Sequence, residues 1–254
     1  MEHKITGIIP ARSGSLRVPN KNQILVGGHP LIAYSIISAI NSGLFSRLIV
    51  ASDSDEICDI GHYYGATEII KRDPSDASST SIDIDWLTNL HNLGKLNQEF
   101  FAILRPTSPL RSVELMKDCV QKFVSSDFDS LRTIKQVSEH PGKMWRFEES
   151  HEITPYLQQD ADSPATHALQ YQSLENLYVQ TSVFEIARTP VIPKTRTREG
   201  KSILGYITTG TDSHSVDTID DLDYLKYISI TKPDLLPQND ISPYERKSDH
   251  KYSI

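Results

Sequence analysis

The sequence predicts an α/β fold with a mostly parallel sheet and helices on both faces. The first observation is that short apolar runs of strand length alternate with amphipathic segments of helix length over residues 4–137. Parallel strands need a crossover between them, so this alternation is typical of a sheet covered on both sides. The second observation is the length, because 254 residues can bury a core without disulfides or metals.

The individual elements follow from the apolar runs and the residues that flank them. Strands are expected at 4–10, 47–52, 67–71, 100–106 and 130–137, and helices at 30–43, 53–65, 79–94 and 112–126. Pro30 suits a first helical turn and Gly43 suits a helix end. Asp53, followed by an acid three residues later, and Ser112 are expected to cap their helices.

The second half of the chain departs from this regular alternation. Residues 138–200 are polar, aromatic and irregular, which indicates an insertion with short strands, and 177–187 within it is expected to form a strand and then a helix. A strand at 203–209 and a helix at 217–230, capped by Asp217 or Thr218, complete a domain over 1–231. Residues 232–254 are polar and contain prolines, so a loosely ordered tail is expected.

Composition excludes several classes of function. A net charge of −7 argues against general binding to nucleic acids or anionic membranes, although a local basic pocket remains compatible with it. The N-terminal apolar run is too short for a signal peptide, and no stretch is apolar over the ~18 residues that a span needs. Cys58 and Cys119 have no partner at metal-ligand spacing and are expected to be buried thiols. A cytoplasmic protein is therefore expected.

The segment "IIPARSGSLRVPNKN", residues 8–22, follows the first strand and carries the first candidate site. In parallel sheets ligands bind at the carboxyl ends of strands. Small residues there offer backbone N–H groups, and three cations with no acid among them suit a polyanion; these are Ser13, Gly14, Ser15, Arg12, Arg17 and Lys21. The dinucleotide and P-loop glycine motifs are absent. A solvated basic loop is the alternative.

Two further strand ends carry polar segments. "LRPTSPLRS", residues 104–112, offers two hydroxyls and two guanidinium forks for phosphate or carboxylate, or it is only a proline-defined turn before a helix. "KRDPSDASSTSID", residues 71–83, suits hydrogen bonds to hydroxyls or base edges, or it is a helix-capping loop.

An acidic segment, residues 211–224, supplies a candidate metal ligand. Asp217 lies at a strand-to-helix junction, where one carboxylate suits Mg²⁺ that is held mainly by phosphates. The alternative is a helix cap. Among the histidines only His140, close to Lys143, is a candidate for a ligand contact. No serine or cysteine has a paired histidine pattern, which argues against a covalent nucleophile.

With these residues in view, the sequence resembles the bacterial cytidylyltransferases that activate nonulosonic acids, such as the CMP-sialic, CMP-legionaminic and CMP-pseudaminic acid synthetases. The family's opening motif is close to IPARxGSKxxPxKN, and this chain has "IPARSGSLRVPNKN". Further similarities are "PLIAYSI", "RLIVASDSDEI", "RPTSPLR", "EHPGKMWR" and "LYVQTSVFEIA", so that the resemblance covers roughly residues 4–228.

The resemblance implies a Rossmann-like nucleotide-diphosphosugar transferase fold with an inserted dimerisation region at 138–200. It implies the conversion of CTP and a sugar acid into a CMP-sugar and diphosphate with Mg²⁺ or another divalent cation, by direct attack of the anomeric hydroxyl on the α-phosphate. A homodimer is expected, and no nucleic acid or membrane partner. Neighbouring possibilities are a nucleotidyltransferase for another sugar or nucleotide and a nucleotide-binding relative that has lost activity.

Site residues carry over by motif position. Catalytic roles fall to Arg12, Lys21 and Asp217, with Asp217 also the metal ligand. The residues expected to bind the nucleotide are Ala11, Arg12, Ser13, Gly14, Ser15, Arg17, Lys21, Asn22, Arg72, Ser81, Asp83, Arg105, Pro106, Thr107 and Ser108. The residues expected to bind the sugar are Arg105, Arg111, His140, Lys143, Tyr178 and Gln180.

The chain also departs from the family pattern. Leu16 stands where the family has lysine, and Arg17 is expected to replace that charge. Arg105 stands in place of a common glutamine, and Ser215 in place of the first acid of a late Asp-x-Asp motif. The stretch that carries a sugar-binding arginine in sialic acid synthetases reads "SPATHALQY" here, which argues against acetylneuraminic acid itself as substrate.

Overall fold

The computed structural model describes residues 4–15, 17–73, 82–157 and 164–245. The chain divides into two compact units. Unit 1 comprises Met1–Thr133 together with Thr181–Ile254, and unit 2 comprises Ile134–Gln180. Within the described residues, no helix is long and apolar enough to span a membrane.

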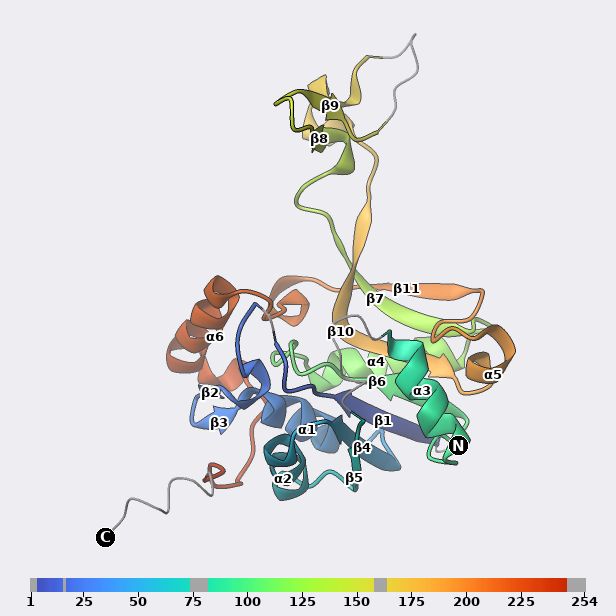
Figure 1. Ribbon diagram of the computed structural model, residues 1–254, viewed down its shortest axis with the longest axis vertical. Coiled ribbons are helices and arrows are strands. Elements are labelled where there is room, and N and C mark those ends of the chain that lie inside the picture. The colour runs from blue at the N-terminus through green and yellow to red at the C-terminus, as the bar shows by residue number, and fades with distance from the viewer. Residues whose placement is uncertain (1–3, 16, 74–81, 158–163, 246–254) are drawn as a thin grey trace. The chain divides into compact units, whose positions relative to one another are not determined.

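A seven-stranded sheet organises unit 1, in the order β11-β7-β10-β6-β1-β4-β5 (Figure 1). The strands are β1 Ile5–Pro10, β4 Arg47–Ser52, β5 Glu68–Lys71, β6 Phe100–Ile103, β7 Ser130–Gln136, β10 Tyr178–Arg188 and β11 Ile203–Ile207. β1 runs parallel to β4 and β6, and β4 parallel to β5, whereas β10 is antiparallel to β6. The predicted α/β fold with a mostly parallel sheet is confirmed.

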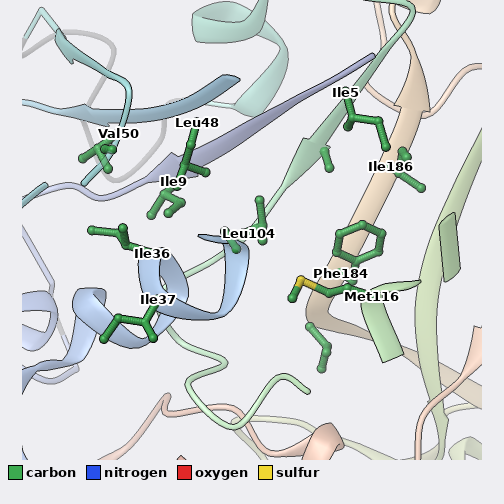
Figure 2. Close-up of a cluster of buried hydrophobic side chains, with 14 of the residues drawn as sticks. Ile5, Ile9, Ile36, Ile37, Leu48, Val50, Leu104, Met116, Phe184 and Ile186 are labelled. Atoms are coloured by element: carbon green, nitrogen blue, oxygen red, sulfur yellow. The ribbon is translucent and has the colours of Figure 1, made fainter. Parts of the chain in front are cut away.

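Helices cover both faces of this sheet. They are α1 Leu31–Ser42, α2 Asp55–Tyr63, α3 Asp83–Asn92, α4 Val113–Val124, α5 Val191–Thr195 and α6 Ile219–Thr231. Successive side chains of a strand point to opposite faces. Ile5 and Ile9 of β1 therefore pack in the core under α1, α2 and α4. Figure 2 shows them with Ile36 and Ile37 of α1 and Met116 of α4. Ile8 packs in the core under α3 and α5.

The helix caps agree with the prediction at α4 and α6 and differ from it at α2. Ser112 caps α4 as predicted, and Gly43 ends α1 with φ 64°. Ser54, not Asp53, caps α2 by accepting from the backbone N–H of Ile57. Thr218, not Asp217, caps α6, in a capping box with Asp221. Neighbouring residues with equal capping ability compete, so the carboxylates of Asp53 and Asp217 are available for other contacts.

A third apolar core lies beside the sheet. It packs the inner face of α6, including Leu222 and Leu225, against Val18, Val216 and a short hairpin of β2 Leu25–Val26 and β3 His29–Pro30. Gly27 and Gly28, with φ 54° and 89°, form the two-residue hairpin turn. This core holds the segment after β1 next to the segment before α6.

The described part of the predicted tail, residues 232–245, makes specific contacts with the rest of unit 1. Leu236 is buried, and Tyr63 donates a hydrogen bond to the Ser242 carbonyl at 3.1 Å. The Tyr244 backbone N–H donates to the Tyr64 hydroxyl at 3.2 Å, and the Tyr244 ring meets Tyr63 edge-on. These apolar and aromatic contacts fix a segment whose composition is polar. Residues 246–254 lie outside the described residues.

Unit 2 contains a two-stranded ribbon of β8 Trp145–Phe147 and β9 Ile153–Pro155. It is shorter than the insertion expected at 138–200, because residues 181–199 belong to unit 1. The segment 177–187, expected to form a strand and then a helix, is part of the single strand β10, and the short helix α5 comes after it.

Candidate functional site

The segment after β1 is fixed to the carboxyl end of β4. Ala11 donates its backbone N–H to the Ala51 carbonyl at 3.0 Å. The backbone N–H and the hydroxyl of Ser13 donate to the two oxygens of Asp53, at 2.8 and 2.6 Å. Burial alone would raise the pKa of Asp53, but the hydrogen bonds from Ser13 and others outweigh it and hold that pKa below its usual value. Asp53 is thus a charged anchor for the Ser13–Ser15 turn.

The cations of the same segment gather around Asp217. Arg17 Nη2 lies 3.3 Å and Lys21 Nζ 3.7 Å from Asp217 Oδ1. Lys21 Nζ also donates to the Val216 carbonyl at 2.6 Å, and Ser215 donates its hydroxyl to Asp217 Oδ2 at 2.8 Å. Burial lowers the pKa of Lys21, and the carboxylate of Asp217 only partly offsets this. Arg17, Lys21 and Asp217 are called the cation cluster below.

The "RPTSPLRS" segment joins the cation cluster through the backbone of one residue, Val216. The Val216 backbone N–H donates to the Thr107 carbonyl at 2.7 Å, while the Val216 carbonyl accepts from Lys21. The segments after β1 and β6 and the segment before α6 therefore meet at one place. Pro106 and Ser108 are buried, and within the described residues the Ser108 hydroxyl has no hydrogen-bond partner.

Arg105 belongs to a different cluster. Its guanidinium binds the carboxylates of Asp83 at the start of α3 and of Glu185 on β10. Arg198, which precedes β11, also binds Asp83 and lies 3.6 Å from Glu185. Arg132 on β7 and Glu199 complete the set, with Arg132 3.2 Å from Glu185 and 3.9 Å from Glu199. These three arginines and three carboxylates are called the arginine–carboxylate network.

A pocket lies beside the carboxyl ends of β4 and β5. Its volume is about 380 Å³, and its lining includes Ala51, Ile70, Arg72, Trp86 and Asn89. The guanidinium carbon of Arg72 stands 5.5 Å from the centre of the Trp86 ring, a cation–π contact at the pocket wall. Ser81, expected to bind nucleotide, lies outside the described residues.

The chain is similar to known proteins in both sequence and fold. Residues 6–199 match the family described as Cytidylyltransferase. The chain belongs to the cytidylyltransferase family. The predicted nucleotidyltransferase class agrees with that membership.

Curated relatives of the chain include proteins named for several sugar acids. An N-acylneuraminate cytidylyltransferase of Streptococcus agalactiae is 34% identical over 53% of this chain and 33% of its own length. A pseudaminic acid cytidylyltransferase of Campylobacter jejuni is 38% identical over 47% of this chain and 53% of its own. A CMP-N,N'-diacetyllegionaminic acid synthase of Legionella pneumophila is 36% identical over 46% and 52%. The chain spans about half the length of the curated relatives it matches, or less.

Solved structures extend the similarity of fold. A CMP:2-keto-3-deoxy-manno-octonic acid synthetase in complex with CTP has a TM-score of 0.64 at 15% identity, covering 89% of this chain and 98% of its own. A 4-diphosphocytidyl-2C-methyl-D-erythritol synthase from Anaerococcus prevotii has a TM-score of 0.60 at 12% identity, covering 89% and 98%. At these identities the likeness concerns the fold alone, and it agrees with the nucleotidyltransferase fold implied by the sequence.

One of the residues expected to bind the sugar, Arg111, is buried. Arg111 is 1% exposed, and its guanidinium donates to the carbonyl of Val183, to the hydroxyl of Ser35 at 3.3 Å and to the carbonyl of Arg105 at 2.9 Å. Burial lowers its pKa to about 9. Arg111 holds the backbone beneath the site and does not line an open surface, because its fork is saturated by protein oxygens.

Asn22 also serves the backbone. Its side-chain N–H donates to the Arg12 carbonyl at 3.0 Å, and the residue is 7% exposed. This bond closes the segment after β1 on itself and holds the Arg12 backbone. Arg12 is half-buried, and Gly14 is exposed. The direct nucleotide contact expected for Asn22 is therefore replaced by a supporting one in this structure.

The remaining predicted sugar contacts lie in unit 2, which is described by itself. His140 is 5% exposed; its Nδ1 accepts from the Gly142 backbone and its Nε2 lies 3.1 Å from the Glu175 carbonyl. Lys143 donates to the carbonyls of His167, at 2.8 Å, and Leu169. Both side chains stabilise unit 2 in this structure, so the expected free ligand role of His140 is not found. Tyr178 and Gln180 are exposed.

Asp217 is the described carboxylate best placed for a metal. Across the described ranges, no group of three or more His, Cys, Asp or Glu side chains could hold a metal ion. The Asp212 carboxylate accepts hydrogen bonds from Ser112, and the Asp221 carboxylate belongs to the capping box of α6. Among the described residues, the Asp217 carboxylate contacts side chains only. Mg²⁺ on a polyphosphate needs one or two protein carboxylates, since water and phosphate supply the rest. The donor set fits that arrangement.

Sequence reasoning missed five residues of these clusters: Asp53, Arg132, Glu185, Arg198 and Glu199. Asp53 was interpreted as a helix cap, although its place directly after a strand was a signal for the site edge. The other four come from β7, β10 and the segment after α5, and they meet Asp83 and Arg105 only through the sheet order. No spacing in the sequence marks them.

Proposed function

We propose that this chain transfers a cytidylyl group from CTP to a sugar acid of the nonulosonic class, forming a CMP-sugar and diphosphate. Membership of the cytidylyltransferase family supports the use of CTP. Three sets of curated relatives, named for acylneuraminate, pseudaminic acid and legionaminic acid, support an acidic sugar as acceptor. The individual acid remains open within that class.

The cation cluster is the observation that carries the proposal. Arg17 and Lys21 lie beside the Asp217 carboxylate, and Arg12 precedes them in the same segment, so this edge offers three cationic side chains to an anion. The Ser13–Ser15 turn, anchored by Asp53, brings backbone N–H groups to the same edge. A triphosphate matches both features.

The reaction needs positioning and charge stabilisation and no covalent intermediate. The anomeric hydroxyl of the sugar acid attacks the α-phosphorus, and diphosphate leaves. Lys21 and Arg17 stabilise the charge that develops on the phosphate oxygens. The pocket beside Arg72 and Trp86 has the size of small-molecule sites and is proposed to take the base.

Asp217 is the residue that would hold a divalent cation. Such a cation, when bound, neutralises phosphate charge and polarises the reacting phosphorus. The chain's own contribution is to orient the Asp217 carboxylate, with Ser215 on one oxygen and the two cations on the other. Mg²⁺ therefore remains a proposal that rests on one carboxylate.

A homodimer through unit 2 is proposed as well. Unit 2 exposes many large apolar side chains for its 47 residues, among them Trp145, Phe147, Ile153, Tyr156 and Tyr171. Such exposed apolar surface is typical of interaction sites. Sedimentation at two protein concentrations with the wild type and a Phe147→Ser variant would test it; a wild-type monomer would contradict it. The cytoplasmic location expected from the sequence stays a prediction.

The decisive experiment measures diphosphate release. The wild type is incubated with Mg²⁺, CTP and a panel of nonulosonic and related 2-keto sugar acids, and UTP, GTP and ATP replace CTP in parallel. Turnover with CTP and at least one acid is expected, with Lys21→Met as the matched loss-of-charge variant. No CTP binding and no turnover with any acid would refute the proposal.

A second outcome, CTP binding without turnover, is suggested by Ser215. Ser215 stands where the family has an acid, and its hydroxyl takes one oxygen of Asp217. If CTP binds in the presence of Mg²⁺ but no acid is turned over, the chain is a nucleotide-binding relative that has lost activity. Turnover with another nucleotide in place of CTP would instead support the wider nucleotidyltransferase alternative.

A further inference from the structure

Asp83 begins α3 directly after the segment that is expected to contact the nucleoside, and its carboxylate is fully engaged by the protein. Oδ1 accepts from the Trp86 indole N–H at 3.1 Å, and Oδ2 accepts from Arg105 and Arg198. Burial alone would raise the pKa of Asp83, yet the two guanidinium charges and these hydrogen bonds hold it below its usual value. Asp83 thus stays charged and is oriented by Trp86 of the same helix and by two arginines from elsewhere in the chain.

Arg198 reaches Asp83 from a segment that is itself rigid. The Gly200 backbone N–H donates to the Thr197 hydroxyl at 2.9 Å, and Asp129 accepts from the backbone N–H groups of Lys201 and Ser202 at 2.8 and 3.1 Å. Gly200 has φ 74°, and a Cβ there would lie 2.4 Å from the Asp129 Cβ. The backbone around Arg198 is therefore held independently of Asp83, which is what a positioning residue requires.

The charge balance singles out Arg198 within the arginine–carboxylate network. Without Arg198, Asp83 still has Arg105, Glu185 still has Arg105 and Arg132, and Glu199 still has Arg132. No carboxylate of the network would be left without an arginine. Removing Arg198 should therefore loosen the start of α3 without leaving a buried unpaired charge.

We propose that Arg198 is a positioning residue that acts through Asp83. By holding the Asp83 carboxylate together with Arg105, it fixes the first turn of α3, and with it the wall of the pocket that contains Trp86. The role of Arg198 is to set the affinity for the nucleotide, and it does not touch the reacting atoms. This inference rests on the proposed use of CTP.

The test compares Arg198→Ala, Arg198→Lys and the matched control Arg196→Ala in the full chain. Arg196 is an exposed arginine two residues away, for which no ion pair is found among the described residues. Arg198→Ala is expected to raise the Kd and the KM for CTP about three- to tenfold while kcat changes less than about twofold. Arg198→Lys should recover part of the affinity, and Arg196→Ala should match the wild type.

A second arm isolates the path through Asp83. In an Asp83→Asn background, Arg198→Ala should add less than about twofold to the Kd, because the carboxylate on which it acts is gone. Hydrogen exchange at the backbone amides of α3 should speed up in Arg198→Ala and not in Arg196→Ala.

The outcomes separate the two proposals. If the wild type neither binds CTP nor turns it over, the proposed function fails and this inference falls with it. If the wild type binds CTP but Arg198→Ala keeps the same Kd, or loses melting temperature and α3 protection with no change in Kd, the positioning role is refuted and the function stands. Equal effects of Arg198→Ala in the wild-type and Asp83→Asn backgrounds would refute the path through Asp83.

Discussion

The cation cluster and the arginine–carboxylate network of unit 1 differ in how far their charges are balanced. In the cation cluster Arg17 and Lys21 share the single carboxylate of Asp217. In the arginine–carboxylate network three arginines meet three carboxylates, and Glu185 contacts all three arginines. The cation cluster has more cations than carboxylates and can bind an anionic ligand, whereas in the network the arginines and carboxylates neutralise one another.

Exposure separates Arg17 from the network, although Lys21 of the cation cluster is only 12% exposed. The Arg17 side chain is 71% exposed, whereas the side chains of the network range from 11% to 33%. Charges that are withdrawn from water must be paired, or they cost several kcal/mol. An arginine in the network is therefore committed to the fold, and one in the cation cluster is available for binding. The type of residue alone does not reveal which of the two roles it has.

The largest expected effect breaks the network and is one of stability. Arg132→Met leaves Glu199 and Glu185 with fewer partners in a part-buried place, so the free energy of unfolding should fall by about 2–3 kcal/mol. Urea unfolding followed by circular dichroism measures it, with Arg196→Met as the control. An unchanged midpoint would show that the network does not stabilise the fold.

The next effect is expected in the cation cluster and is one of activity. Lys21→Met keeps the aliphatic stem and removes the charge, so kcat/KM for CTP should fall roughly 10- to 50-fold, the cost of one charge-assisted contact to phosphate. The melting temperature should change little. Lys122→Met, which removes an exposed lysine of α4, is the control. A variant that unfolds instead would place Lys21 in the framework.

A smaller effect is expected at Asp53, which anchors the Ser13–Ser15 turn. Asp53→Asn loses the charge and one acceptor for Ser13, so the KM for CTP should rise about fivefold, and Ser13→Ala should act in the same direction. An unchanged KM in both variants would contradict the anchoring role.

The pH dependence of the free energy of unfolding is a second test of the role of Asp53. Because its pKa in the folded state is lowered from the ordinary 3.8, its stabilising contribution is present above that value and is lost as the pH falls through the lowered pKa. The stability difference between wild type and Asp53→Asn should therefore be constant near neutral pH and shrink in acid below about 3.8. A difference that grows in acid would contradict the assignment.

The smallest effect is expected at Arg17. Its exposed guanidinium is well screened, so Arg17→Ala should raise the KM for CTP only about two- to threefold at low salt, and the difference should disappear near ~0.5 M salt. Titration of KM against ionic strength measures it. A large effect that persists at high salt would make Arg17 as strong a phosphate contact as Lys21 and the full replacement for the charge that the family carries at position 16.

These contrasts also explain how much of the molecule the sequence could reveal. β4 was predicted at its observed bounds, because an apolar run between a polar segment and a capping region has few alternatives. The cap of α2 was assigned one residue too early, and that of α6 was left between Asp217 and Thr218, since Asp53 and Asp217 can cap as well as their neighbours. Their actual partners, Ser13 and Lys21, are distant in sequence, and only the folded sheet brings them near.

Arg105 and Arg111 show the limit most clearly. Both belong to one motif and both were expected to bind sugar, yet Arg111 is sealed by the Val183 carbonyl and Arg105 is paired with Asp83 and Glu185. The burial of Arg111 is decided by β10, whose Val183 comes more than seventy residues later in the chain. A motif can therefore identify the edge of the sheet that carries the site without saying which of its arginines face outward.

The backbone N–H and carbonyl of Val216 limit which changes the sequence around residue 216 can accept. Its N–H and carbonyl connect the Thr107 segment and Lys21, while its side chain lies in the core beside α6. Because the connection is made by main-chain atoms, exchanging one apolar side chain for another of similar size at 216 preserves it. Adding or deleting a single residue between Thr209 and Thr218 would shift the peptide and separate the two segments. This stretch should tolerate substitution and resist any change of length.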